Sequence, residues 1–221
     1  MRPHHPMTWD VLFLLSDTGG GHRASARAIG EALQRLGGDS VHCTLTDLFA
    51  LHGPWPLNQI PHIYAPLVTH HVWLWRLLWR AGAQPWLWRL TTRLMMAWNR
   101  QRLQHLFEEH PADLVVSVHP LLNHVPLQAL REPSWRPATP FATVVTDLAT
   151  APPIWYNPAV DLLCASCREV QQAALASGVP GDRIRLTGLP ISLRYLQPPG
   201  ERFELRQRLS LLQLPTVLVM G

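Results

Sequence analysis

Three consecutive glycines, followed by a histidine and an arginine, are the first residues of this sequence whose types and spacing could do chemistry. The segment consists of Thr18, Gly19, Gly20, Gly21, His22 and Arg23. Glycines tolerate positive φ and let backbone N–H groups approach a ligand without an intervening Cβ atom. An apolar run precedes the glycines and a helical pattern follows them, so they lie where a helix dipole favours anions. The pattern predicts a site for an anion or a polar ligand, with His22 at its mouth.

Two nucleotide-binding motifs also contain glycine loops, and the sequence fits both poorly. A P-loop needs Lys and Ser/Thr after its glycines, whereas this chain has His22, Arg23 and Ala24 there and contains no lysine. A dinucleotide-binding loop needs the spacing G-x-G-x-x-G, which is absent, although Asp47 lies in a later strand as that fold requires. A tight turn that binds nothing remains the simplest alternative.

Other polar side chains follow the ends of expected strands. The sequence predicts strands over Val11–Leu15, Ser40–Thr46, Asp113–Val118, Phe141–Thr146, Leu162–Ala165 and Arg183–Thr187. Asp47, His119 and Asp147 come directly after strands, and His22 follows the first strand across the glycines. Because ligands bind beyond the carboxyl ends of parallel strands, we expect these four side chains to converge on one cleft. Structural roles are the alternatives, with Asp147 capping its loop and His119 bonded to a loop carbonyl.

Helical patterns alternate with these strands, and this alternation sets the fold class. Helices are expected from Arg23 to Leu36, from Leu121 to Leu130 and from Arg168 to Ser177. Residues 48–61, rich in Pro and Gly, are expected to form a long irregular loop. The pattern predicts an α/β fold with a doubly wound, Rossmann-like parallel sheet and helices on both faces.

Residues 61–102 are rich in Trp and Arg and contain no acidic residue. Arginines interrupt every window of the ~20 apolar residues that a transmembrane helix needs. Gly82 and Pro85 divide the region into two amphipathic pieces, which are typical of helices in a bilayer interface, with helices packed on the sheet as the alternative. The predicted membrane contacts are Trp73, Trp75, Arg76, Trp79, Arg80, Trp86, Trp88 and Arg89.

Composition narrows the class of protein. The 221 residues are 47% hydrophobic, as in a globular chain, and the formal net charge is +4. Because no nucleic-acid-binding motif is present, a basic chain of this kind favours an anionic membrane over nucleic acid. Cys164 and Cys167 have redox or metal spacing, but packing at a strand end is the favoured interpretation because no further ligands complete a set. The first residues lack the pattern of a signal peptide, so we expect a cytoplasmic compartment.

Four stretches resemble one enzyme family. Residues 16–29, SDTGGGHRASARAI, resemble the N-terminal loop of the monogalactosyl- and glucosyl-diacylglycerol synthases, which are GT-B glycosyltransferases. Residues 117–127 (SVHPLLNHVPL), 144–147 (VVTD) and 188–190 (GLP) also match. A more distant resemblance is to the enzyme that makes the peptidoglycan lipid precursor. The resemblance implies the N-terminal half of a GT-B fold with a Trp/Arg-rich helical insertion that contacts the membrane.

The family resemblance implies a reaction and residue roles. It implies transfer of a hexose, galactose or glucose, from a UDP-sugar to diacylglycerol with inversion of the anomeric centre. His22 is then the base, because a helix N-terminus keeps its imidazole neutral. Asp147 orients His22 or the acceptor, with Asp17 as the carboxylate nearer in sequence. Residues 18–21 and Arg23 bind the acceptor or the diphosphate. No metal or other cofactor is expected, since the chain has no Asp-x-Asp motif.

The resemblance also extends to the cleft lining and shows one departure. His119 and Trp155 are expected to line the cleft. Pro152 stands where the family has a histidine, which puts the choice of acceptor in question, whereas Pro153 and Trp155 match.

The resemblance further predicts a domain plan and partners. Residues 1–190 are expected to form the acceptor-binding domain, 191–214 a linker and helix, and 215–221 the first strand of a missing C-terminal UDP-sugar domain. The expected partners are diacylglycerol, anionic membrane lipids and the UDP-sugar, at the cytoplasmic face of a membrane as a peripheral protein. A catalytically inactive membrane-binding fragment and a UDP-GlcNAc transferase of the peptidoglycan-precursor type are the alternatives.

Overall fold

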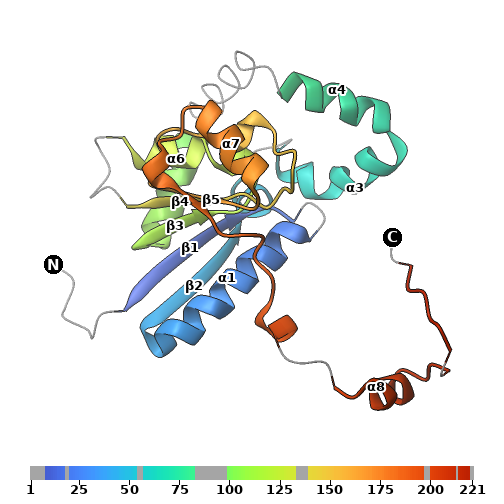
Figure 1. The fold of residues 1–221 in the computed structure, drawn as a ribbon. Helices are drawn as coiled ribbons and strands as arrows, with labels where there is room; N and C mark the ends of the chain where they lie inside the picture. Colours follow the sequence, from blue (N-terminus) through green and yellow to red (C-terminus); the bar gives the residue numbers. More distant parts are fainter. Residues whose placement is uncertain are drawn as a thin grey trace.

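A parallel sheet of six strands, in the order β2-β1-β3-β4-β5-β6, forms the centre of the fold (Figure 1). The computed structural model describes residues 8–17, 20–53, 57–82, 99–132, 139–196, 200–212 and 214–219. The strands are β1 (Trp9–Leu15), β2 (Val41–Asp47), β3 (Leu114–Ser117), β4 (Phe141–Val144), β5 (Leu162–Ala165) and β6 (Ile184–Leu186). Each neighbouring pair of strands is parallel. The predicted α/β fold with a doubly wound parallel sheet is therefore confirmed.

The strand order changes direction beside β1. The chain runs from β1 to β2 on one side and then continues with β3 on the other side of β1. Just beyond β3, the backbone N–H of Val118 donates to the carbonyl of Leu14, with 3.1 Å between N and O. In open α/β sheets, ligands bind outside the carboxyl ends of the strands at such a switch point. The topology therefore indicates a ligand site at the segments that follow β1 and β3.

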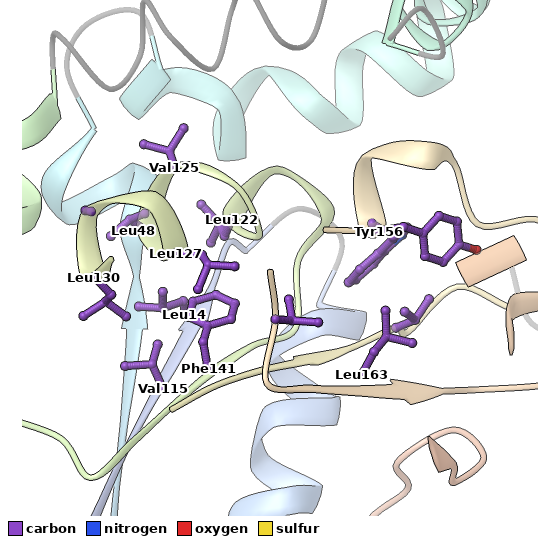
Figure 2. Close-up of a cluster of buried hydrophobic side chains, with 14 of the residues drawn as sticks. Leu14, Leu48, Val115, Leu122, Val125, Leu127, Leu130, Phe141, Tyr156 and Leu163 are labelled. Carbon is purple, nitrogen blue, oxygen red and sulfur yellow. The ribbon is translucent and has the colours of Figure 1, made fainter. Parts of the chain in front are cut away.

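Both faces of the sheet are buried, which explains the unbroken apolar run of β1. Successive strand residues point to opposite faces, so Leu12 and Leu14 pack in one core cluster, and Phe13 and Leu15 pack in the other. Figure 2 shows the first cluster, in which side chains from β1, β3 and β4 meet those from the helix that follows β3. On the opposite face, Ala26 and its neighbours pack against the sheet. A doubly wound sheet with two covered faces requires this pattern.

Helices cover these faces and extend beyond one edge. They are α1 (Gly21–Gly37), α2 (Leu48–His52), α3 (Ile60–His70), α4 (Val72–Gly82), α6 (Val125–Leu130), α7 (Arg168–Ala176) and α8 (Arg202–Arg208), and residues 99–109 are also helical. α2 contacts α3, and α3 contacts α4, so a chain of short helices leads outward from the carboxyl end of β2 (Figure 1). Within the described part of the chain, no helix has the length and apolarity needed to cross a bilayer.

The expected irregular loop over residues 48–61 is wrong at its end, where α3 begins at Ile60, and at its start, where residues 48–52 form α2. The cause is Asp47, whose carboxylate accepts a hydrogen bond from the backbone N–H of Ala50 at 2.9 Å and so caps the helix. Its other carboxylate oxygen accepts from the backbone N–H of Asp17, also at 2.9 Å. Asp47 is 5% exposed. It thus holds the segment after β1 against the start of α2 and has a structural role at the predicted site.

The expected strand at the end of the chain is also not formed. Residues 215–219 are assigned to no strand, and Val217, Leu218 and Val219 are exposed. A strand requires a hydrogen-bonded neighbour, and none lies beside this segment in the described ranges. An apolar sequence pattern alone does not supply that neighbour.

We predict that Asp47→Ala lowers the free energy of unfolding by about 1–3 kcal/mol, because two backbone N–H groups lose a buried acceptor. Urea denaturation followed by circular dichroism measures this change. The exposed Asp39→Ala variant is the control and should stay within about 0.5 kcal/mol of the wild type. Equal stabilities for the two variants would show that the carboxylate of Asp47 does not hold these segments together.

Candidate active site

His22 lies at the switch point, in the first turn of α1. Its Nδ1 atom is 2.7 Å from the carbonyl oxygen of Val118, which follows β3, and 3.0 Å from Oγ1 of Thr146, which follows β4. The glycine turn and the start of α1 thus bring a histidine from after β1 to the ends of two other strands. The side chain is partly exposed.

These hydrogen bonds decide which ring nitrogen of neutral His22 carries the proton. A carbonyl oxygen can only accept, so at 2.7 Å Nδ1 must be the protonated nitrogen and donate to Val118. Nε2 then carries the lone pair. In this tautomer the imidazole can accept a proton from a bound ligand at Nε2.

Burial lowers the pKa of His22, and two smaller effects oppose it. The hydrogen bond to the carbonyl of Val118 and the negative charge of Asp147 both raise this pKa, but desolvation dominates. The net lowering keeps His22 neutral at pH 7, the form that acts as a base. The charge of Asp147 also favours the imidazolium that forms when the ring takes up a proton.

A second histidine packs against the first. The rings of His22 and His119 meet edge to face with their centroids 4.5 Å apart, and the ring of Phe49 contacts His119 at 5.8 Å. Nδ1 of His119 accepts a hydrogen bond from the backbone N–H of Leu121 at 3.3 Å. Complete burial, together with the nearby His22, lowers the pKa of His119 well below its ordinary value. His119 is therefore a neutral packing partner of His22 at pH 7.

Asp147 and Trp155 are bonded to each other beside this pair. The indole Nε1 of Trp155 donates to Oδ2 of Asp147 at 2.7 Å, and the ring of Trp155 lies 6.3 Å from that of His22. Trp155 is fully buried. Pro152, the residue that departs from the family pattern, begins the turn that places Trp155, since its carbonyl accepts from the Trp155 N–H at 3.0 Å. The structure thus gives Asp147 a partner other than His22.

The described part of the glycine turn is open on its outer side. Gly20 has φ of +78°, which favours glycine. Apart from the adjoining residues, no heavy atom of the described ranges lies within 4 Å of where a Cβ would be at Gly20 or Gly21. The N-cap residue of α1 is Gly20, which makes no side-chain hydrogen bond to the helix. Thr18 and Gly19, also predicted for this loop, lie outside the described residues.

Arg23 has a partner of its own. Its guanidinium binds the carboxylate of Asp17 through two hydrogen bonds of 2.6 Å each. Asp17 precedes the glycines and Arg23 follows them, so the pair joins the two sides of the turn. Asp17, the alternative carboxylate for orienting His22, therefore binds Arg23, whose hydrogen bonds and charge lower the pKa of Asp17.

A second polar network lies next to the site and was not assigned a role from the sequence. The amide of Asn157 donates to the backbone carbonyl of Asn123 at 3.2 Å and to Nδ1 of His124 at 3.3 Å, while Nε2 of His124 donates to the carbonyl of Ile154 at 3.0 Å. Burial lowers the pKa of His124 to about 4, so this ring is neutral at pH 7. These bonds join the segment after β3 to the turn that carries Trp155.

Sequence reasoning also missed Thr146 and the carbonyl of Val118. Both lie in stretches that carried the family resemblance, but a backbone carbonyl has no sequence signature, and Thr146 was quoted only as part of VVTD. Among the residues that the structure describes, no three His, Cys, Asp or Glu side chains gather as a metal site.

The predicted membrane contacts fall on different sides of α4. Trp73, Arg76, Leu77 and Arg80 lie three or four positions apart and are exposed, with Trp73 68% exposed and Leu77 57% exposed. We call these four residues the exposed face of α4. Trp75 instead packs edge to face against Tyr64 of α3, with the ring centroids 5.5 Å apart. The side chain of Trp79, and all of Trp86, Trp88 and Arg89, lie outside what the structure describes.

Comparison with known proteins gives several alignments that cover nearly all of this chain. It is 39% identical over 217 residues to monogalactosyldiacylglycerol synthase 1, chloroplastic, of Arabidopsis thaliana. It is 37% identical over 212 residues to the probable chloroplastic monogalactosyldiacylglycerol synthase of Nicotiana tabacum. These alignments cover 96% of this chain but 40% and 39% of the two relatives, respectively, so the chain spans about two fifths of their length.

A solved structure and a family model also match. The crystal structure of Anabaena Alr3699/HepE in complex with UDP and glucose aligns with 91% of this chain and 50% of that protein, at a TM-score of 0.47 and 14% identity. The family model for monogalactosyldiacylglycerol (MGDG) synthase matches residues 22–191, which include every residue of the site from His22 to Trp155. The chain therefore belongs to the monogalactosyldiacylglycerol synthase family.

Proposed function

We propose that this chain is the acceptor-binding part of an inverting glycosyltransferase that moves a hexose from a UDP-sugar to diacylglycerol. Membership of the MGDG synthase family supports this reaction, and the names of the relatives favour galactose over glucose as the sugar. The observation that carries the proposal is the tautomer of His22, whose Nδ1–H is held by Val118 so that Nε2 can accept a proton.

His22 acts as the general base in this reaction. Nε2 takes the proton of the free glycerol hydroxyl while that oxygen attacks the anomeric carbon, the bond from this carbon to the diphosphate breaks, and UDP leaves with the electron pair. The carboxylate of Asp147 stabilises the imidazolium that results, in keeping with its raising effect on the pKa of His22. The rings of His119 and of Trp155, which is bonded to Asp147, pack beside the imidazole of His22 and restrict its position.

The glycine turn provides backbone donors for the polar part of a substrate. Gly20 and Gly21 are open on their outer side, and Gly20 makes no side-chain hydrogen bond to the start of α1. The N–H groups there bind the diphosphate or the acceptor head, where the helix dipole favours negative charge. The Asp17–Arg23 pair sets the width of the turn. The remaining contacts to the UDP-sugar belong to a further domain.

The exposed face of α4 binds the membrane that contains the acceptor. Indole and leucine side chains enter the interface between headgroups and acyl chains, and the two guanidinium groups bind anionic headgroups. α4 contacts α3, α3 contacts α2, and Phe49 of α2 contacts His119. A continuous series of contacts therefore links the exposed face of α4 to the base. We place the protein at the cytoplasmic face of the membrane, as a peripheral protein.

We predict that His22→Ala lowers sugar transfer by about 10²–10⁴-fold, the usual contribution of a general base. For the assay, the chain is joined at its carboxyl end to the UDP-sugar domain of the Arabidopsis relative. The fusion is supplied with vesicles that contain diacylglycerol and with UDP-galactose or UDP-glucose. His42→Ala, which removes an exposed histidine of β2, is the control and should retain full activity. Undiminished transfer by His22→Ala would refute the assignment of the base.

The assay of the fusion also separates the enzyme from its alternative. A membrane-binding fragment without catalytic function predicts that even the fusion transfers no sugar, whereas the proposed function predicts glycolipid from the fusion. UDP-GlcNAc serves as a third donor, and a preference for it would favour the peptidoglycan-precursor type of transferase.

The pH dependence of the fusion tests the protonation state of His22. Burial lowers the pKa of His22 below its ordinary value of about 6.5, so the neutral base predominates at pH 7 and is lost at lower pH. We therefore expect kcat/KM to fall at acid pH with a midpoint below about pH 6.5. An acid limb centred at or above about pH 7 would contradict a neutral, buried base.

We predict that the double variant Arg76→Gln/Arg80→Gln weakens binding to phosphatidylcholine vesicles that contain phosphatidylglycerol. Two charges at about 1 kcal/mol each correspond to a decrease of roughly 30-fold, measured by cosedimentation. Arg35→Gln/Arg208→Gln removes the same charge from exposed positions on α1 and α8 and should change binding little. Equal losses for both double variants would show that net charge, and not the exposed face of α4, governs the interaction.

A further inference from the structure

We infer that Thr146 is a positioning residue for His22, holding the imidazole through its hydroxyl so that Nε2 faces the acceptor. This inference rests on the proposed function of His22 as the base. It adds a second residue to the reaction, one that touches neither substrate and acts through the ring that does.

The first support is the geometry around Nδ1 of His22. Two oxygens lie within hydrogen-bonding distance of this atom, the carbonyl of Val118 at 2.7 Å and Oγ1 of Thr146 at 3.0 Å. The hydroxyl of Thr146 also points to the same carbonyl, with 3.5 Å between the oxygens. When the hydroxyl donates to the carbonyl, a lone pair of Oγ1 faces the Nδ1–H group. One N–H group is then shared by two acceptors.

The second support is that these acceptors come from different strand ends. Val118 follows β3 and Thr146 follows β4, so Nδ1 of His22 is held from the ends of two adjacent strands. Rotation of the imidazole about the bond that joins it to Cβ breaks the contact with Val118, and the hydroxyl of Thr146 adds a second restraint against that rotation. The ring of His119, whose centroid lies 4.5 Å from that of His22, limits that rotation from one side. A misplacement of the base by about 1 Å is enough to cost 10²-fold in rate.

The chemistry of threonine separates positioning from packing. Valine has the same shape and the same branching at Cβ but no hydroxyl, and serine keeps the hydroxyl but loses the methyl group. A packing role would survive in Thr146→Val and fail in Thr146→Ser. A positioning role predicts the reverse order.

The first experiment uses the 221-residue chain itself, labelled with ¹⁵N-histidine. In the wild type we expect the Nδ1–H tautomer of His22 and an Nδ1–H proton that exchanges slowly with water. In Thr146→Val this proton should exchange at least about tenfold faster, whereas Thr146→Ser should resemble the wild type. Wild-type exchange in Thr146→Val would overturn the inference. Thr146→Ala supplies the same loss of hydroxyl if the valine variant does not fold.

The second experiment measures sugar transfer by the fusion with the Arabidopsis UDP-sugar domain. Thr146→Val should lower kcat by about tenfold with little change in KM, and Thr146→Ser should restore most of the rate. A rise in KM at unchanged kcat would overturn the inference, since it would place Thr146 in substrate binding. The two ideas fail separately: full activity of His22→Ala refutes the base, while wild-type exchange in Thr146→Val refutes only the positioning role.

Discussion

The hydrogen bond from Nδ1 of His22 to the carbonyl of Val118 is the interaction on which the rest of the site depends. It crosses the point where the strand order reverses, and it joins the start of α1 to the end of β3. Because the carbonyl accepts and cannot donate, the bond decides the protonation of both ring nitrogens at once. The glycine turn supplies the backbone path that makes this contact reachable, and the sheet supplies its rigidity.

Much of the fold could be predicted because its signals are local. The unbroken apolar run of β1 indicates a strand buried on both faces, and both faces are indeed covered. α2 was missed because its start depends on whether the carboxylate of Asp47 turns back to the N–H of Ala50, which the composition of the loop does not reveal. Residues 215–219 were expected to be a strand because apolar sequence signals burial, yet a strand exists only beside a partner.

The sequence indicated those residues of the candidate site whose types alone suggest a chemical role. His22 and its glycines have that meaning in isolation, whereas the partners of the ring are set by the folded chain. Val118 and Thr146 lie 96 and 124 residues away from His22 in sequence, and one of them acts through its backbone. Arg23 shows the converse case, since its type suggested a ligand for phosphate while its guanidinium is bound by Asp17.

The positive charge of α4 comes from guanidinium groups alone, because the chain contains no lysine. A guanidinium group does not release its proton at any pH that a cell reaches, so the membrane binding proposed for the exposed face of α4 would not depend on pH. An imidazole, by contrast, changes charge within a few pH units. Membrane binding would thus depend on ionic strength and lipid composition, whereas sugar transfer would depend on pH. At acid pH the protein would remain bound to the bilayer without catalysing the reaction.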